Sequence, residues 1–418
     1  MTKTIQILWK LFLFSFPFSV HFVLYEKASY RFGNFSPWVT GFLFLPEILL
    51  ALIFILWLIQ KIVKKELNKF KPPGWGLTLL LLFLLNAGIV TFVFGNPILY
   101  LFFLVRVLEA GMVYVLIRQK LIPHDELVRW LLYGAVFQIL LAYVQTRLNH
   151  SVGLHLLGEP IIGPDVPNVA KTDLTGGGKA IRPYGTFLHP NLLGAYLVTV
   201  FFVSLSYLKK TALPFWIILL SVGIYLTGSQ AAQLTLLATA GILLILSFFK
   251  VAAQKKYLSL GLLGALLFAN LWIYLNSAQL AWNYQSVAER LTQNVISLHM
   301  FLAQWWGVGV ANFTLMMEQF SRVKLLPWEF QPVHNVYFLV LNETGIQGLL
   351  LLVLMVGYML HNYWKTDLNY LLRDKARILP LFALILIASF DHLLWTSWIG
   401  PILVGITVAE TTPAQPPS

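Results

Sequence analysis

Polar residues that could do chemistry stand in four short groups, each beside a long apolar stretch. In chain order the groups are Arg182–Asn191, Thr227–Gln230, His334–Asn335 and Asp391–His392. We predict that each group lies at the start of a helix, where unpaired N–H groups and the positive end of the helix dipole attract negative charge. Helix starts that converge beside arginines, here Arg182 and Arg290, indicate an anion site, above all for phosphate. The alternative is that each group only caps its helix at a membrane surface.

The elements that position these groups are predicted from the apolar composition. Of the 418 residues, 58% are hydrophobic and only 11% are charged, which is typical of an integral membrane protein. A spanning helix needs about 20 apolar residues. We therefore predict an all-α membrane domain over residues 1–410, with about twelve spans, and a disordered Pro-rich tail at 411–418. The expected spans are roughly 5–24, 37–59, 75–94, 97–117, 127–147, 187–208, 213–228, 230–249, 257–276, 333–360, 378–391 and 393–410.

The connecting loops alternate in charge, which predicts the orientation in the membrane. Basic loops lie near residues 61–71, 118–129, 209–210, 250–256 and 365–377, and the positive-inside rule places them in the cytoplasm together with both termini. The two long loops, about 148–186 and 277–332, are poor in lysine and are expected outside, as are all four polar groups. The net charge of +12 is thus explained by topology rather than by nucleic-acid binding.

Three motifs and one arginine carry a resemblance to a known family. They are Arg182-Pro-Tyr-Gly-Thr-Phe…Pro190-Asn191, Trp306-Gly-Val-Gly309…Asn312-Phe313, His334-Asn-Val-Tyr337…Glu343-Thr-Gly345-Ile-Gln-Gly348, and Arg290. Together they resemble the signatures of the O-antigen ligase and O-antigen polymerase family. The matched segments span about the C-terminal half of the chain and do not separate ligase from polymerase.

The resemblance implies a membrane glycosyltransferase of GT-C-type architecture. Family members transfer a glycan from undecaprenyl diphosphate to an acceptor hydroxyl, on lipid A core, another glycan chain or similar, at the outer face of the bacterial cytoplasmic membrane. Arg182 and Arg290 would bind the diphosphate leaving group. His334 would deprotonate or orient the acceptor hydroxyl, with inversion at the anomeric carbon and without metal or cofactor. The alternative role of His334 is to cap its helix.

A further set of residues is expected to support this site. It comprises Tyr184, His189, Asn191, Ser229, Asn335, Tyr337 and Asp391. One position departs from the family pattern, because Gln230 stands where the family usually has an arginine after the serine. We expect Gln230 to contact the diphosphate by neutral hydrogen bonds, which leaves open whether the two arginines suffice, whether the donor differs or whether activity is weaker.

Arg106, Glu109 and Glu343 are expected inside spans. A lone arginine at mid-membrane costs roughly 2.5–3.5 kcal/mol, so Arg106 either pairs with Glu109 one turn away or lines the cavity and contacts the diphosphate. Glu343 lies nine residues after His334, about 13 Å along a helix. It is therefore either a buried packing carboxyl or an indirect support of His334.

A lipid-glycan transporter or flippase is the alternative from another class. It would require cationic residues along a path through the membrane and two repeat-related halves, whereas the polar groups here gather on one face and no repeat is visible. The chain has no cysteine and no Asp-x-Asp motif. Its histidines 124, 150, 155 and 299 lack the spacing of metal ligands, so neither thiolate nor metal chemistry is expected.

Overall fold

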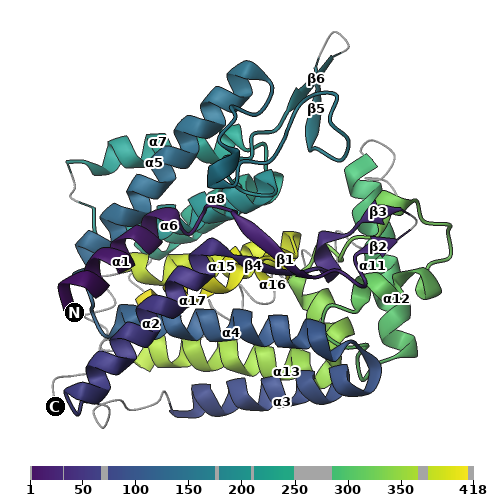
Figure 1. The fold of residues 1–418 in the computed structure, drawn as a ribbon, viewed down its shortest axis with the longest axis horizontal. Coiled ribbons are helices and arrows are strands. Elements are labelled where there is room, and N and C mark those ends of the chain that lie inside the picture. The colour runs from purple at the N-terminus through teal and green to yellow at the C-terminus, as the bar shows by residue number, and fades with distance from the viewer. Residues whose placement is uncertain are drawn as a thin grey trace.

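The computed structural model describes residues 2–31, 33–66, 74–174, 178–208, 211–248, 285–365 and 375–412. The expected span at 257–276, most of the basic loops at 209–210, 250–256 and 365–377, and residues 413–418 of the expected tail lie outside this part. Within it, helices dominate (Figure 1).

Five described helices are long and apolar enough to cross a membrane: α2 (Leu45–Val63), α3 (Gly74–Phe94), α4 (Pro97–Arg118), α5 (His124–Leu148) and α13 (Val336–Lys365). The chain is therefore a multi-pass membrane protein. Four apolar helices are shorter: α6 (Pro190–Leu205), α7 (Leu213–Leu226), α15 (Leu379–Phe390) and α17 (Ile399–Thr411). The other described α-helices are α1 (Thr2–Ser15), α8 (Gln230–Phe248), α11 (Gln285–Ala303), α12 (Phe313–Phe320) and α16 (Leu393–Thr396). The count of twelve spans remains a prediction.

The described structure is mostly helical, as expected of an all-α membrane protein, and six short strands accompany the helices. In antiparallel pairs, β1 (His21–Tyr25) joins β4 (Gly41–Phe44), β2 (Tyr30–Arg31) joins β3 (Asn34–Phe35), and β5 (Lys171–Leu174) joins β6 (Gly178–Ile181). The expected helix at 5–24 ends at Ser15, because Pro17 cannot continue it and the aromatic and β-branched run that follows favours a strand. For the same reason α2 begins at Leu45, after β4, rather than at residue 37. Short 3-10 turns also interrupt the loops at Pro37–Val39, His155–Leu157, Pro327–Glu329 and Lys375–Ile378.

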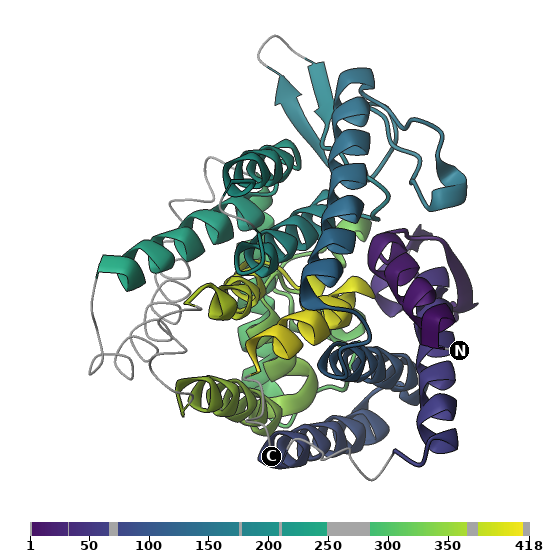
Figure 2. The same cartoon turned by 90° about the vertical axis from the view of Figure 1, so that its left-hand side faces the viewer.

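Helix α6 forms the centre of the core. It is buried from Pro190 to Ser204 and packs against α5, α7, α8, α15 and α17. A helix that is apolar all round and shielded from lipid by other helices does not have to match the bilayer thickness. Figure 2 shows the yellow C-terminal helices in the middle of the molecule, with purple α1 and α2 to one side.

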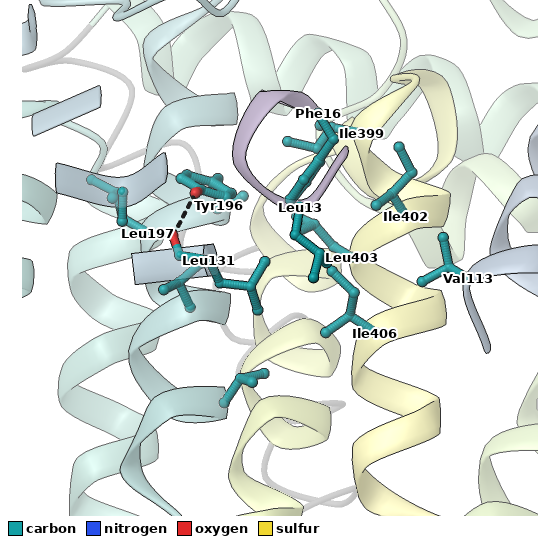
Figure 3. Close-up of a cluster of buried hydrophobic side chains, with 14 of the residues drawn as sticks. Leu13, Phe16, Val113, Leu131, Tyr196, Leu197, Ile399, Ile402, Leu403 and Ile406 are labelled. Atoms are coloured by element: carbon teal, nitrogen blue, oxygen red, sulfur yellow. Dashed lines mark hydrogen bonds between the residues drawn. The ribbon is translucent and has the colours of Figure 1, made fainter. Parts of the chain in front are cut away.

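Close packing joins this centre to helices that are distant in sequence. Leu13 of α1 and Phe16 just after it lie against Ile399, Ile402 and Leu403 of α17 (Figure 3). On the other side, the Tyr196 hydroxyl of α6 donates a hydrogen bond to the Leu131 carbonyl of α5, at 3.1 Å. The phenol thus satisfies its one polar group and leaves the rest of its ring for packing.

The expected helix at 378–391 is present as α15, and the expected helix at 393–410 is divided into α16 and α17. α15 ends at Phe390, α16 has only four residues, and α17 begins at Ile399. At 1.5 Å per residue, α15 is about 18 Å long, less than the ~30 Å of a bilayer core. Irregular backbone inside a membrane protein is tolerated where protein covers it, and both Asp391 and His392 at the first break are only 2% exposed.

Helix α13 is interrupted by a glycine that interlocks with the loop at Trp306–Gly309. Gly345 has φ 75° and ψ 178°, a conformation available essentially only to glycine. The interruption lets the carbonyls of Asn342 and Glu343 accept hydrogen bonds from the N–H groups of Val308 and Gly309, at 2.8 and 3.0 Å. A Cβ on Gly345 would overlap the Trp306 carbonyl. The glycines of the two C-terminal motifs therefore hold one another in place.

We predict that Gly345→Ala destabilises the protein by about 1–3 kcal/mol, because alanine is strained at this backbone conformation and meets the loop. Gly357→Ala, in the same helix but with no neighbour near the added carbon, is the matched control and should be neutral or slightly stabilising. Thermal unfolding in detergent measures both. Equal melting temperatures for the two variants would contradict the interlock.

Candidate active site

The four polar groups meet where the ends of several helices converge. Arg182 donates through Nε to the Thr227 carbonyl at 3.0 Å and through Nη2 to Asn191 Oδ1 at 2.5 Å. Asn191 in turn donates through Nδ2 to Asp391 Oδ2 at 2.7 Å. One chain of hydrogen bonds therefore joins three of the groups.

His334 belongs to the same cluster. Its ring centroid lies 5.0 Å from that of His392, the residue that follows Asp391. His334 Nδ1 lies 2.7 Å from Oε1 of Gln293 on α11. Arg290, one turn earlier on α11, is close enough for its charge to affect Arg182, His334 and Asp391. His334 is thus tied to α11 as well as to the break after α15.

The segment that presents Arg182 is held by two buried glutamines of α5. Gln145 Oε1 accepts the N–H groups of Tyr184 and Gly185, at 2.9 and 2.8 Å, while its Nε2 donates to the Gly185 carbonyl. Gln138, two turns earlier, accepts the Thr186 N–H at 2.9 Å. Because both amides lie inside the protein, they replace the water that an irregular backbone requires. The position of Arg182 is therefore set by α5.

The remaining groups cap helices. Asn335 Oδ1 accepts the N–H groups of Tyr337 and Phe338 at the start of α13, His189 accepts the Asn191 N–H at the start of α6, and Ser229 accepts the Ala232 N–H in α8. Gln230 is the first residue of α8 and is exposed. Each group reaches the start of a helix, but Arg182 itself lies eight residues before α6, and Asp391 ends α15 just before His392 begins α16.

Burial and mutual charge control the protonation of this cluster. Burial lowers the pKa of His334 well below 6.5, the positive charge of His392 lowers it further, and Asp391 opposes both. Burial together with Arg182 lowers the pKa of His189 to about 3. Burial raises the pKa of Asp391, but the positive charges of His392, His334 and Arg290 lower it by more. The pKa of Asp391 is therefore below its usual value. At neutral pH the cluster therefore combines neutral imidazoles with an ionised carboxylate.

Asp391 is also incompletely bonded. Its side chain is buried, Oδ2 accepts from Asn191, and Oδ1 has no hydrogen-bond partner within the described part of the chain. An ionised carboxylate oxygen can only accept, and leaving one unsatisfied is costly. The arrangement therefore suits a ligand that brings a hydroxyl or another donor.

Several candidates lie elsewhere. Arg106 pairs with Glu47 and Glu109 and donates to the Phe42 carbonyl, so its bonds in the described structure join α4 to α2 and β4. The Tyr337 hydroxyl donates to the Ile385 carbonyl, and the Tyr184 hydroxyl accepts from Ala170 N–H. Glu343 accepts from Trp395 Nε1 at 2.7 Å rather than from His334. These bonds join neighbouring elements.

Sequence reasoning missed Gln293 as a partner of His334, did not give His392 a role in the site, and missed the glutamines of α5. Gln293 could have been found from its spacing, because it follows Arg290 by three residues and such residues share a helix face. Gln138 and Gln145 share a face in the same way, seven residues apart, but no local signal says which backbone they bond.

A comparison with known protein families finds a match for the central part of the chain. Residues 215–353 match the O-Antigen ligase family. The match confirms the resemblance that the motifs indicated and indicates glycan transfer of O-antigen ligase or polymerase type. It covers 139 of the 418 residues, including Arg290, Gln293 and His334. No curated protein matches the chain.

We predict that acid destabilises the protein through its buried histidines. Burial lowers the folded-state pKa of His392 below 6.5. Its contribution to the free energy of unfolding is therefore complete above pH 6.5 and is lost as the pH falls towards the folded-state pKa. Each such histidine removes about 1.4 kcal/mol per pH unit in that window. Unfolding measured from about pH 7.5 to pH 5 should show a shallower dependence in His392→Gln and an unchanged one in His150→Gln, since His150 is exposed. Identical slopes in the wild type and His392→Gln would contradict the prediction.

Proposed function

We propose that this protein transfers a glycan from undecaprenyl diphosphate to an acceptor hydroxyl, as an O-antigen ligase does, at the outer face of the bacterial cytoplasmic membrane. The observation that carries the proposal is the meeting of Arg182, Arg290, His334 and Asp391 in one cluster. It combines two cations suited to a diphosphate with a neutral imidazole and a carboxylate suited to a hydroxyl. The positive-inside pattern supports this orientation, with the cluster outside and both termini inside.

The diphosphate would lie between Arg182 and Arg290. Arg182 uses two of its five N–H groups on Thr227 and Asn191, which fix the guanidinium and leave others for an anion. Arg290 has no hydrogen bond to any residue in the described ranges, and within them its neighbours in the cluster are mostly basic. Gly228, with φ 60°, lets Arg182 lie against the start of α8, since a Cβ there would come within 3.1 Å of Nε. The positive end of the α8 dipole and the exposed Gln230 would add to the site.

The acceptor would react in a single displacement. Its hydroxyl oxygen attacks the anomeric carbon of the donor glycan, the bond from that carbon to the phosphate oxygen breaks, and undecaprenyl diphosphate leaves with the electron pair. His334 takes the hydroxyl proton and later releases it to solvent. The anomeric centre is inverted, and the two arginines stabilise the charge that develops on the diphosphate.

Asp391 would receive a second donor from the acceptor at Oδ1. Sugars present neighbouring hydroxyls, so a hydrogen bond from one of them to Asp391 would turn the reacting hydroxyl towards His334. The carboxylate would also stabilise the imidazolium that forms when His334 is protonated.

An assay with purified protein tests the proposal. Undecaprenyl-diphosphate glycan and acceptor glycolipid, both isolated from a strain that lacks this protein, are supplied in detergent. Transfer with release of undecaprenyl diphosphate supports the enzyme. Absence of turnover, combined with movement of the lipid-linked glycan across vesicle membranes, would favour the transporter instead.

The same deletion strain separates ligase from polymerase. Loss of finished polymer with long carrier-bound glycan retained indicates a ligase. Accumulation of single repeat units indicates a polymerase. The motifs and the family match are shared by both, so this glycan profile carries the distinction.

We expect His334→Ala to lower transfer by about 10²-fold or more, the usual contribution of a general base, with donor binding kept. His299→Ala is the control, because His299 lies on α11 and its Nδ1 faces the Phe320 carbonyl instead. Initial rates with saturating donor measure the effect. Turnover near the wild-type value would remove His334 as the base.

Arg290→Ala should weaken the use of donor by about 10- to 100-fold in kcat/KM, because a charged hydrogen bond to the diphosphate is lost. KM for the acceptor should change little. Arg322→Ala, an exposed arginine of the same outer loop, is the matched control. A selective rise in the KM for the acceptor would contradict the prediction, because it would mean that Arg290 binds the acceptor rather than the donor.

A further inference from the structure

We propose that Gln293 is a positioning residue that holds His334 in one tautomer, with the proton on Nδ1 and the lone pair on Nε2. Only the expected effect of this bond on catalysis rests on the proposed function. The tautomer itself is a property of the unliganded protein and can be measured without substrate.

The geometry of the pair carries the inference. The carbonyl oxygen of Gln293 lies 2.7 Å from His334 Nδ1, and the Gln293 side chain is only 4% exposed, so water does not compete for the bond. A carbonyl oxygen has no proton to give, so Nδ1 must supply it. A neutral imidazole carries one N–H, which leaves Nε2 as the basic atom.

The placement of Gln293 makes this bond durable. Gln293 lies one turn after Arg290 on α11, and α11 packs against α13. A second amide, Asn342 of α13, donates to Ser297 of α11 at 2.5 Å and fastens the two helices one turn further along. The His334 ring is therefore held from α11, while its backbone is held at the start of α13.

The surroundings favour a neutral ring that can accept a proton transiently. The groups that face it are His392 beside α16, His189 before α6, Arg290 on α11 and Asp391 after α15. Three of these four are basic, and the one carboxylate opposes them. When Nε2 takes a proton from the acceptor hydroxyl, the Nδ1–H bond to Gln293 remains and no rearrangement of the ring is required.

The experiment is nitrogen NMR of full-length protein in lipid nanodiscs with ¹⁵N-labelled histidine. The chain has nine histidines, so the His334 signals are assigned by difference against His334→Gln. At neutral pH we expect a protonated Nδ1 and an unprotonated Nε2. The two nitrogens are distinguished by their couplings to the protons on the ring carbons Cδ2 and Cε1. An Nε2–H tautomer would overturn the proposal, because it would require the amide N–H of Gln293 to face the ring.

Two substitutions separate positioning from simple packing. Gln293→Met keeps the length of the side chain but not the oxygen, so His334 should become a mixture of tautomers. Gln293→Glu keeps an acceptor and adds a negative charge, so the Nδ1–H tautomer should persist and the NMR titration of His334 should move up by about one pH unit or more. Asn294→Ala, the next residue of α11, should leave both readouts unchanged. A Met variant with the wild-type tautomer would refute the role of Gln293.

The same variants connect the tautomer to catalysis. Transfer should fall by about 10- to 100-fold in Gln293→Met, with donor binding retained. His334 must be neutral to act as a base. When the pH is lowered, the Gln293→Glu variant should therefore lose activity at a higher pH than the wild type does. If the wild type shows no transfer at all, the proposed function fails while the NMR result still decides the tautomer.

Discussion

The hydrogen-bond chain from Arg182 through Asn191 to Asp391 is the interaction on which the arrangement of the site depends. It joins the irregular segment before α6 to the break after α15, 200 residues later in the chain. A buried carboxylate is costly unless it is bonded and near positive charge, and Asn191 meets the first need while the surrounding basic groups meet the second. Because the amide of Asn191 accepts from Arg182 and donates to Asp391, it allows a cation and an anion to share one site without forming a closed ion pair. Such an ion pair would occupy the groups that a ligand needs.

The polar backbone around this chain is possible because protein covers it on every side. Two glutamines of α5 bond the Tyr184–Thr186 segment, and the interrupted carbonyls of α13 receive the N–H groups of the glycine loop. Helices α6, α15 and α17 are shorter than a bilayer is thick, yet they lie inside a ring of other helices. Helices α6, α15 and α17 are largely buried, whereas few residues of α2, α3 and α4 are. This division puts irregular, functional backbone where lipid does not reach it.

The family match and the site overlap only in part. The matched segment contributes Arg290, Gln293 and His334 from α11 and the start of α13, whereas Arg182, Asn191 and Asp391 come from outside it. The proposed division of labour follows the same line. Under the proposal, α11 would set the tautomer of His334, and the helices that enclose α6 would position Asp391 and Arg182.

The sequence by itself determined the membrane class, the long spans α2 to α5 and α13, and the residue types that converge, because apolar runs and polar motifs are local signals. It failed at residues 21–25 and 41–44, where strands β1 and β4 replace helix, and at the break between α16 and α17, since neither the pairing of distant strands nor the covering of a broken helix can be read from the local sequence. Only the tertiary structure decided which polar groups bond. The sequence allowed both Arg106, inside a span, and Arg182, beside one, to contact the diphosphate. In the described part of the chain, Arg106 has Glu47 and Glu109 as partners, whereas Arg182 is joined to a carboxylate through Asn191. The difference arises because a buried charge takes the partners that the fold brings within a few ångströms, and that distance is a property of packing rather than of sequence spacing.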